Sequence, residues 1–288
     1  MLVALTTVCE RWAMHVVERL GFSAGSTVAV VHADDVGMSH AANIGAFAAL
    51  DTGPATCASV MVPCPWFSEA AAMARARPDV DLGVHLTLNA EFDGYRWGPV
   101  AGRTAVPSLV DEAGHLRRTS RETVKSGTIA DVRSELRAQI DAALAAGIDV
   151  THLDSHMGTV FHPKFFDVYL ELGREYRLPL FLPRVPEFRP DPDGFIMFDG
   201  FDADSLDFES GEGRTHNERR IRNLGAGLNY LICHPAQGGA ELSAITDSAH
   251  QRDFERTFYG GDAGRAAFAD AGVETIGMRE VRELLRGR

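Results

Sequence analysis

Two adjacent carboxylates, Asp34 and Asp35, directly follow an apolar run at residues 27–31. A buried strand that ends in this way delivers both acids to a site, because each charge must be solvated, paired or bound to a metal to avoid the cost of desolvation. The pair therefore predicts a bound cation. A structural alternative is a capping or turn pair that leads into Gly37 and Ser39, and the pair alone leaves both interpretations open.

Metal-capable side chains also end a second apolar run, residues 151–156 with the sequence THLDSH. Alternate residues of a strand share a face, so His152, Asp154 and His156 are expected to point the same way. One carboxylate with two imidazoles binds a borderline divalent ion and leaves positions open for water and substrate. Asp154 is interpreted here as an acceptor that orients a ligand histidine, in preference to a direct ligand.

Three further apolar runs carry a polar group at or near their ends, and these groups are His85, Arg184 and His234. A lone histidine in an apolar strand is more often a hydrogen-bonded core residue than a ligand, but five strand ends with such groups favour the ligand role for His85. Asp35, His85 and His156 could then supply the ligands of one ion. Arg184 is expected to pair with a buried carboxylate at the same edge.

Short apolar runs alternate with amphipathic stretches along the chain, which predicts an α/β fold with a mostly parallel sheet. A length of 288 residues suits a closed or nearly closed barrel, so the predicted fold is a distorted, seven-stranded β/α (TIM-like) barrel. The predicted strands are residues 27–33, 55–62, 82–88, 149–155, 178–184, 228–233 and 273–278. The predicted helices between them are residues 41–50, 67–76, 128–146, 164–176 and 248–259.

Two long connections, residues 89–127 and 186–213, are rich in Gly, Pro and charge and are expected to overhang the strand ends, where ligands bind. Residues 1–25 are predicted to form an N-terminal helical extension, because apolar residues recur at near-helical spacing over 12–20. Length alone is compatible with one domain or two. The pattern of elements favours a single β/α-barrel catalytic domain at residues 26–288.

The chain carries a formal net charge of −12 and has a sequence pI of about 5.3. This balance argues against a nucleic-acid or anionic-membrane partner, whose recognition needs clustered Lys and Arg. We expect a small-molecule partner and, as is common for small enzymes, a homo-oligomer. The N-terminus shows no leader, no stretch is long and apolar enough to span a membrane, and the four cysteines lack CxxC spacing. A cytoplasmic protein with reduced core thiols is therefore expected.

Several of these segments, taken in order, resemble the YdjC/ChbG family of carbohydrate deacetylases, which remove acetyl groups from N-acetylated sugars. The resemblance is spread over most of the chain. It is carried by ADDVGMS at residues 33–39 with Asn43 after it, GVHLTL at 83–88, THLDSH at 151–156 and CHP at 233–235.

The resemblance implies a distorted β/α barrel and one divalent metal ion, zinc or alternatively magnesium, held by Asp35, His85 and His156. It implies Asp34 as the general base and His234 as a candidate general acid. The expected reaction is hydrolysis of an N-acetyl group on an amino sugar or oligosaccharide, in which the ion acidifies a water molecule. Asp34 and Asp35 can divide these tasks only if the chain turns between them.

The chain also departs from the family pattern, since the further histidines common before the proline of this segment are missing between His156 and His162, and His32 replaces a usual Asn. Tyr95 and Trp97 could stack on a sugar ring or could anchor their own loop. Two other functions remain open at this point. They are a metal-dependent barrel hydrolase of an ester, phosphoester or cyclic amide, and a non-catalytic sugar-binding relative.

Overall fold

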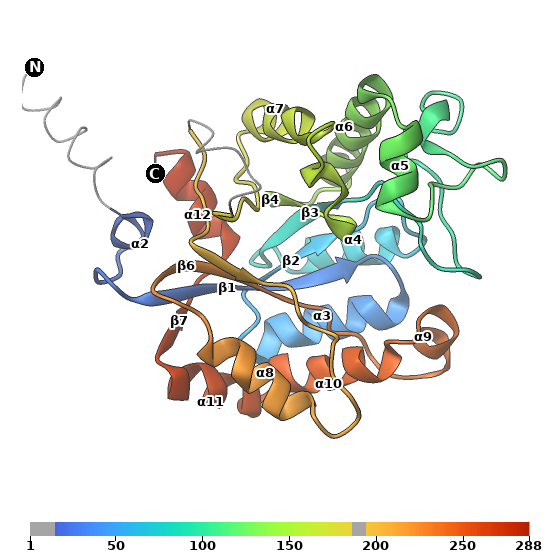
Figure 1. The fold of residues 1–288 in the computed structure, drawn as a ribbon. Helices are drawn as coiled ribbons and strands as arrows, with labels where there is room; N and C mark the ends of the chain where they lie inside the picture. Colours follow the sequence, from blue (N-terminus) through green and yellow to red (C-terminus); the bar gives the residue numbers. More distant parts are fainter. Residues whose placement is uncertain (1–14, 186–193, 288) are drawn as a thin grey trace, which may run out of the picture.

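Seven parallel strands form one sheet in the computed structural model, which describes residues 15–185 and 194–287 (Figure 1). The order across the sheet is β4-β3-β2-β1-β6-β5, and β7 pairs with β1. The strands are β1 (Thr27–Val36), β2 (Cys57–Val60), β3 (Leu82–Leu86), β4 (Val150–Ser155), β5 (Gly200–Asp202), β6 (Gly227–Cys233) and β7 (Val273–Thr275).

The gap between β4 and β5 is closed by an irregular segment, so that the sheet curves into a distorted barrel. Leu180 bridges to Leu153 of β4, and Pro183 bridges to Phe198 just before β5. The predicted strand at residues 178–184 is therefore corrected to isolated bridges, because its prolines have no N–H group to donate to a ladder. The strand β5 lies instead in the long connection predicted at residues 186–213. The α/β class and the distorted barrel are confirmed.

Helices cover the outside of the barrel, and α3, α10 and α11 lie on the opposite side of β1 from α6 and α7 in Figure 1. All five predicted helices form, with ends within two residues of the predicted ones. In order, the helical elements are α2 (Val16–Arg19), α3 (His40–Thr52), α4 (Phe67–Ala76), η1 (Pro107–Leu109), α5 (Ser120–Ser126), α6 (Ile129–Ala145), η2 (His156–Phe161), α7 (Phe166–Tyr176), α8 (Gly213–Arg222), α9 (Ala240–Ile245), α10 (Ala249–Tyr259), α11 (Asp262–Ala271) and α12 (Met278–Leu285).

Side-chain caps begin α3 and α6. The Ser39 hydroxyl accepts a hydrogen bond from the Ala42 N–H at 3.0 Å and so starts α3 directly after the acid pair. Thr128 accepts from the Asp131 N–H at 3.1 Å at the start of α6. Each cap satisfies one of the N–H groups that a first helical turn leaves unpaired.

The apolar core divides into an outer layer beneath the helices and an inner layer within the barrel. Alternate residues of β1 join different layers, since Ala29 and Val31 pack in the outer cluster and Val28 and Val30 in the inner one. Val17 of α2 is 1% exposed and packs in the inner cluster, so the described part of the leading segment contributes to the barrel core.

The outer cluster extends from β1 to Val273 of β7, and we propose residues 26–288 as one domain on that basis. The helical extension predicted at residues 1–25 lies outside the described residues up to residue 14, and the remainder contains the short helix α2. Among the residues that the structure describes, no helix is long and apolar enough to cross a membrane.

Candidate metal centre and active site

The acid pair ends β1 with a sharp change of backbone direction. The register between β1 and β2 shifts between Ala33 and Val36, and Asp35 has a φ of 68°, in the left-handed region. Non-glycine residues enter this region rarely, and such strain concentrates at functional sites. The predicted turn between Asp34 and Asp35 is therefore present, and the two side chains can serve different partners.

Asp35, His85 and His156 converge at the carboxyl ends of their strands. Their facing atoms lie close together, with Asp35 Oδ1 3.4 Å from His156 Nδ1 and 3.6 Å from His85 Nε2. The three residues are only 2–6% exposed, and together they could hold a metal ion. Ligand atoms at about 2.0–2.1 Å from one tetrahedral zinc ion lie roughly 3.3 Å apart, close to these separations.

One atom of this cluster tests the fit of a cation directly. Asp35 Oδ1 is buried and has no hydrogen-bond partner among the described residues. An unpaired buried carboxylate oxygen is costly, and a bound cation would remove that cost. The donor set therefore fits a divalent ion, as the sequence predicted.

The outward nitrogen of each of the two histidines contacts a carboxylate. His85 Nδ1 lies 2.8 Å from Asp154 Oδ2, and His156 Nε2 lies 3.0 Å from Glu91 Oε2. Each contact assigns the ring proton to that side, which leaves the other nitrogen free to face the cluster. Asp154 thus occupies the orienting position predicted for it. Glu91 was not predicted, because it lies in a long connection with no sequence signal that joins it to His156.

These carboxylates also set the charge of the two rings. Burial lowers the pKa of His156, but Glu91 and Asp35 outweigh it and raise that pKa to about 10. Burial likewise opposes the Asp154 and Asp34 carboxylates, which raise the pKa of His85 to about 9. Without a cation, both rings therefore carry a proton on each nitrogen and are positively charged at neutral pH.

A buried arginine faces the cluster from α10. Arg252 is 6% exposed and donates from Nη1 to Asp35 Oδ2 at 2.8 Å. Burial opposes ionisation of Asp35, but Arg252 and the nearby histidines hold its pKa well below the ordinary value. The expected pairing of Arg184 with a buried carboxylate of the site is corrected, since its side chain is 47% exposed and pairs with Asp199 instead. The irregular segment before Arg184 carries that side chain toward the surface.

Asp34 and His234 lie together at one side of the cluster. Asp34 Oδ2 is 3.7 Å from His234 Nε2 and also 3.7 Å from His85 Nε2. Asp34 lies near the end of β1 and His234 directly follows β6, and these adjacent parallel strands bring their carboxyl ends to the same edge. The structure therefore brings all five residues predicted as ligands, base and acid into one site.

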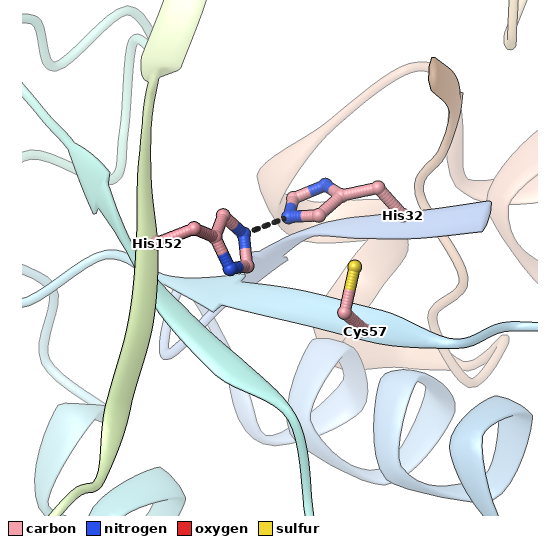
Figure 2. Close-up of side chains that lie close together, drawn as sticks. All are labelled: His32, Cys57 and His152. Atoms are coloured by element: carbon pink, nitrogen blue, oxygen red, sulfur yellow. Dashed lines mark hydrogen bonds between the residues drawn. The ribbon is translucent and has the colours of Figure 1, made fainter. Parts of the chain in front are cut away.

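A second histidine pair, His32 and His152, lies close to Cys57 (Figure 2). His32 Nδ1 is 2.6 Å from Asp34 Oδ1, and His32 Nε2 is 2.8 Å from His152 Nε2. Cys57 completes this fully buried group. Alternation along β1 places His32 on the same inward face as Asp34. A nitrogen–nitrogen distance of 2.8 Å is that of a hydrogen bond, so the pair fixes Asp34 in place.

Tyr95 and Trp97 of the first long connection anchor it over the site. The Tyr95 hydroxyl donates to the Met38 carbonyl at 2.7 Å, and Trp97 Nε1 donates to the Asn89 carbonyl at 2.9 Å. Trp97 is 3% exposed, and its ring centroid lies 6.5 Å from that of His156. The loop-anchoring alternative therefore holds for both residues.

The fold and the cluster define a β/α-barrel protein with a candidate metal centre at the carboxyl ends of its strands. The chain belongs to the YdjC-like protein family, whose pattern matches residues 28–270. This result confirms the resemblance found in the sequence.

Relatives that match most of the chain support its membership of this family. A carbohydrate deacetylase of Thermus thermophilus is 35% identical over 248 residues, 81% of this chain and 86% of the relative. A carbohydrate deacetylase of Geobacillus stearothermophilus is 31% identical over 267 residues, 88% of this chain and 98% of the relative. A crystal structure from Enterococcus faecalis V583, described as a candidate cellobiose-phosphate cleavage protein, is similar with a TM-score of 0.76 and 25% identity, over 89% of this chain and 99% of that one.

Proposed function

We propose that this protein is a metal-dependent carbohydrate deacetylase that hydrolyses the N-acetyl group of an amino sugar or oligosaccharide. The observation that carries the proposal is the buried, unpartnered Asp35 Oδ1 within 3.6 Å of two ring nitrogens, with a second carboxylate beside them. The names of the relatives supply the substrate class. Two imidazoles with one carboxylate favour zinc over magnesium, which prefers oxygen ligands.

Asp35, His85 and His156 would hold the ion. When bound, it would lower the pKa of a water molecule toward about 7 and polarise the acetyl carbonyl. Asp34 would accept the water proton at Oδ2, because its Oδ1 is already engaged by His32. His234 would protonate the departing nitrogen from Nε2, the ring atom that faces Asp34. A positioned acid or base contributes roughly 10²- to 10⁴-fold in rate.

Metal analysis combined with acetate release from a panel of N-acetylated mono- and oligosaccharides tests this proposal. The wild type is expected to bind one divalent ion per chain and to release acetate. Asp34→Asn should retain the ion and lose at least about 100-fold in rate, whereas His85→Ala and His156→Ala should lose the ion. An Asp34→Asn variant with unchanged activity, or unchanged metal stoichiometry in both histidine variants, would refute the assigned roles.

The same panel separates the other two functions. Hydrolysis of esters, phosphoesters or cyclic amides without acetate release from N-acetyl sugars would identify a different hydrolase, and sugar binding without turnover would identify a binding protein. From the sequence, we also propose that the protein is cytoplasmic and forms a homo-oligomer. The described cysteines, Cys57, Cys64 and Cys233, are free and buried, as expected.

A further inference from the structure

The proposed acid, His234, has too low an affinity for protons to act as an imidazolium. Burial and the nearby Arg252 lower the pKa of His234 to about 4, despite the Asp35 and Asp34 carboxylates. The ring is therefore neutral near pH 7 and carries one proton. It can deliver that proton from Nε2 without becoming an anion only if Nδ1 receives another proton at the same time.

The contacts of His234 Nδ1 provide a source for that second proton. Ser205 Oγ lies 2.9 Å from His234 Nδ1, and the same oxygen lies 2.9 and 2.8 Å from the two carboxyl oxygens of Glu255. Ser205 is 1% exposed and Glu255 is fully buried. Glu255 also accepts from the His234 backbone N–H at 2.6 Å, so its carboxyl group holds the residue on two sides.

The Ser205 hydroxyl has a single hydrogen, so it can donate either to Glu255 or to His234 Nδ1 at any one time. If Glu255 is ionised, Ser205 donates to Glu255, His234 donates to Ser205 from Nδ1, and Nε2 carries no proton. If Glu255 is protonated, it donates to Ser205, Ser205 donates to His234 Nδ1, and Nε2 carries the proton that faces Asp34. The tautomer of His234 therefore follows the protonation state of Glu255.

We propose that Glu255 and Ser205 form a buried proton relay that supplies His234, an inference that rests on the proposed deacetylase function. As the C–N bond breaks, its electron pair goes to nitrogen, which takes the proton from His234 Nε2. His234 Nδ1 takes the Ser205 proton, and Ser205 Oγ takes the Glu255 proton. The products are a protonated amine nitrogen and an ionised Glu255, which regains a proton from water along the same three groups in reverse.

The surroundings of Glu255 allow both of its protonation states. Arg220 of α8 approaches Glu255 at 3.4 Å but is itself paired with Asp202 at 2.7 Å. Burial outweighs Arg220, the His234 N–H, Ser205 and Arg252, and raises the pKa of Glu255 to about 7. The other titratable groups packed nearby, Cys233 of β6 and Tyr259 of α10, stay neutral because burial raises their pKa values well above the ordinary range.

Nitrogen-15 NMR of histidine-labelled, metal-free protein between pH 5.5 and 9 tests the relay without turnover. We expect the His234 signals to change from the Nε2–H tautomer to the Nδ1–H tautomer as pH rises through about 7. Ser205→Ala should abolish this change, and Ser205→Thr, which keeps the hydroxyl, should retain it. A wild-type His234 that holds one tautomer over the whole range would overturn the proposal.

Kinetics with two acetyl donors provide a second test of the folded variants. An N-acetyl sugar needs a proton on its leaving nitrogen, whereas an aryl acetate has a leaving oxygen that departs as an anion. Ser205→Ala should slow amide hydrolysis at least about 30-fold more than aryl acetate hydrolysis, within the range for a lost acid, and Ser205→Thr should restore most of the ratio. Equal losses on both donors would indicate a purely structural role and would refute the relay.

The deacetylase function and the proton relay can be refuted independently of each other. A wild type that releases no acetate from any N-acetyl sugar refutes the deacetylase function, while the NMR titration still decides whether Glu255 controls His234. A wild type that releases acetate but shows no change of tautomer refutes the relay alone.

Discussion

Metal binding should displace about two protons from the protein near pH 7. His85 and His156 have pKa values of about 9 and 10 in the absence of a cation, so both rings are protonated at neutral pH. A metal ligand must offer a free lone pair, and binding therefore releases a proton from each ring. Since both pKa values are raised, the apparent affinity should rise by up to about 100-fold per pH unit below pH 9.

Isothermal titration of zinc into metal-free protein, in buffers of different ionisation enthalpy, measures this release. Glu91→Gln should reduce the number of protons released at pH 8, because it removes the carboxylate that raises the pKa of His156 most. Asp93→Asn is a matched control, since Asp93 is an exposed carboxylate in the same loop that pairs with Arg118. Zinc binding with no proton release at pH 7, or an affinity that does not change with pH, would refute this account of the site.

Three further predictions concern stability. Arg252→Met should lower the free energy of metal-free unfolding by about 3–5 kcal/mol, because it removes the arginine that donates to the buried Asp35 Oδ2. Zinc should restore part of the loss in thermal unfolding. Gly37→Ala should cost about 1–3 kcal/mol in denaturant unfolding, because Gly37 has a φ of 88° and an added Cβ would lie 3.1 Å from the Met61 carbonyl oxygen. Because the pKa of Glu255 is raised, its protonated form contributes stability that is complete below the ordinary pKa and is lost as pH rises through about 7. The free energy of unfolding of the wild type, relative to that of Glu255→Gln, should therefore fall by about 3 kcal/mol from pH 4 to pH 8.

The parts of the site that lie on strands could be predicted from the sequence, because strand periodicity and the common direction of parallel strands determine where their ends meet. Asp34, Asp35, His85 and His234 follow this rule. His156 does so only approximately, since β4 ends at Ser155 and His156 begins a 3₁₀ turn.

The partners that lie on helices and loops could not be predicted in this way. Arg252 is 217 residues from Asp35 along the chain, and Glu255 is 50 residues from Ser205. Their positions depend on how α10 packs and on the course of the connection between β5 and α8. The strand prediction at residues 178–184 was wrong for a different reason. The apolar pattern of this segment predicts a strand, but its two prolines have no N–H group to donate to a regular ladder.

The partners of the histidines separate the proposed metal ligands from the proposed acid. His85 and His156 each contact a carboxylate directly, and such a contact keeps the proton on the outer nitrogen and the lone pair toward the cluster. His234 contacts its carboxylate through the Ser205 hydroxyl, which can donate or accept. A group that must present a proton in one step and regain it in the next needs such a reversible partner, whereas a ligand needs a fixed one. Replacing Ser205 with Ala should therefore impair proton delivery by His234 while zinc stoichiometry stays at one per chain, and loss of zinc in that variant would contradict this division of roles.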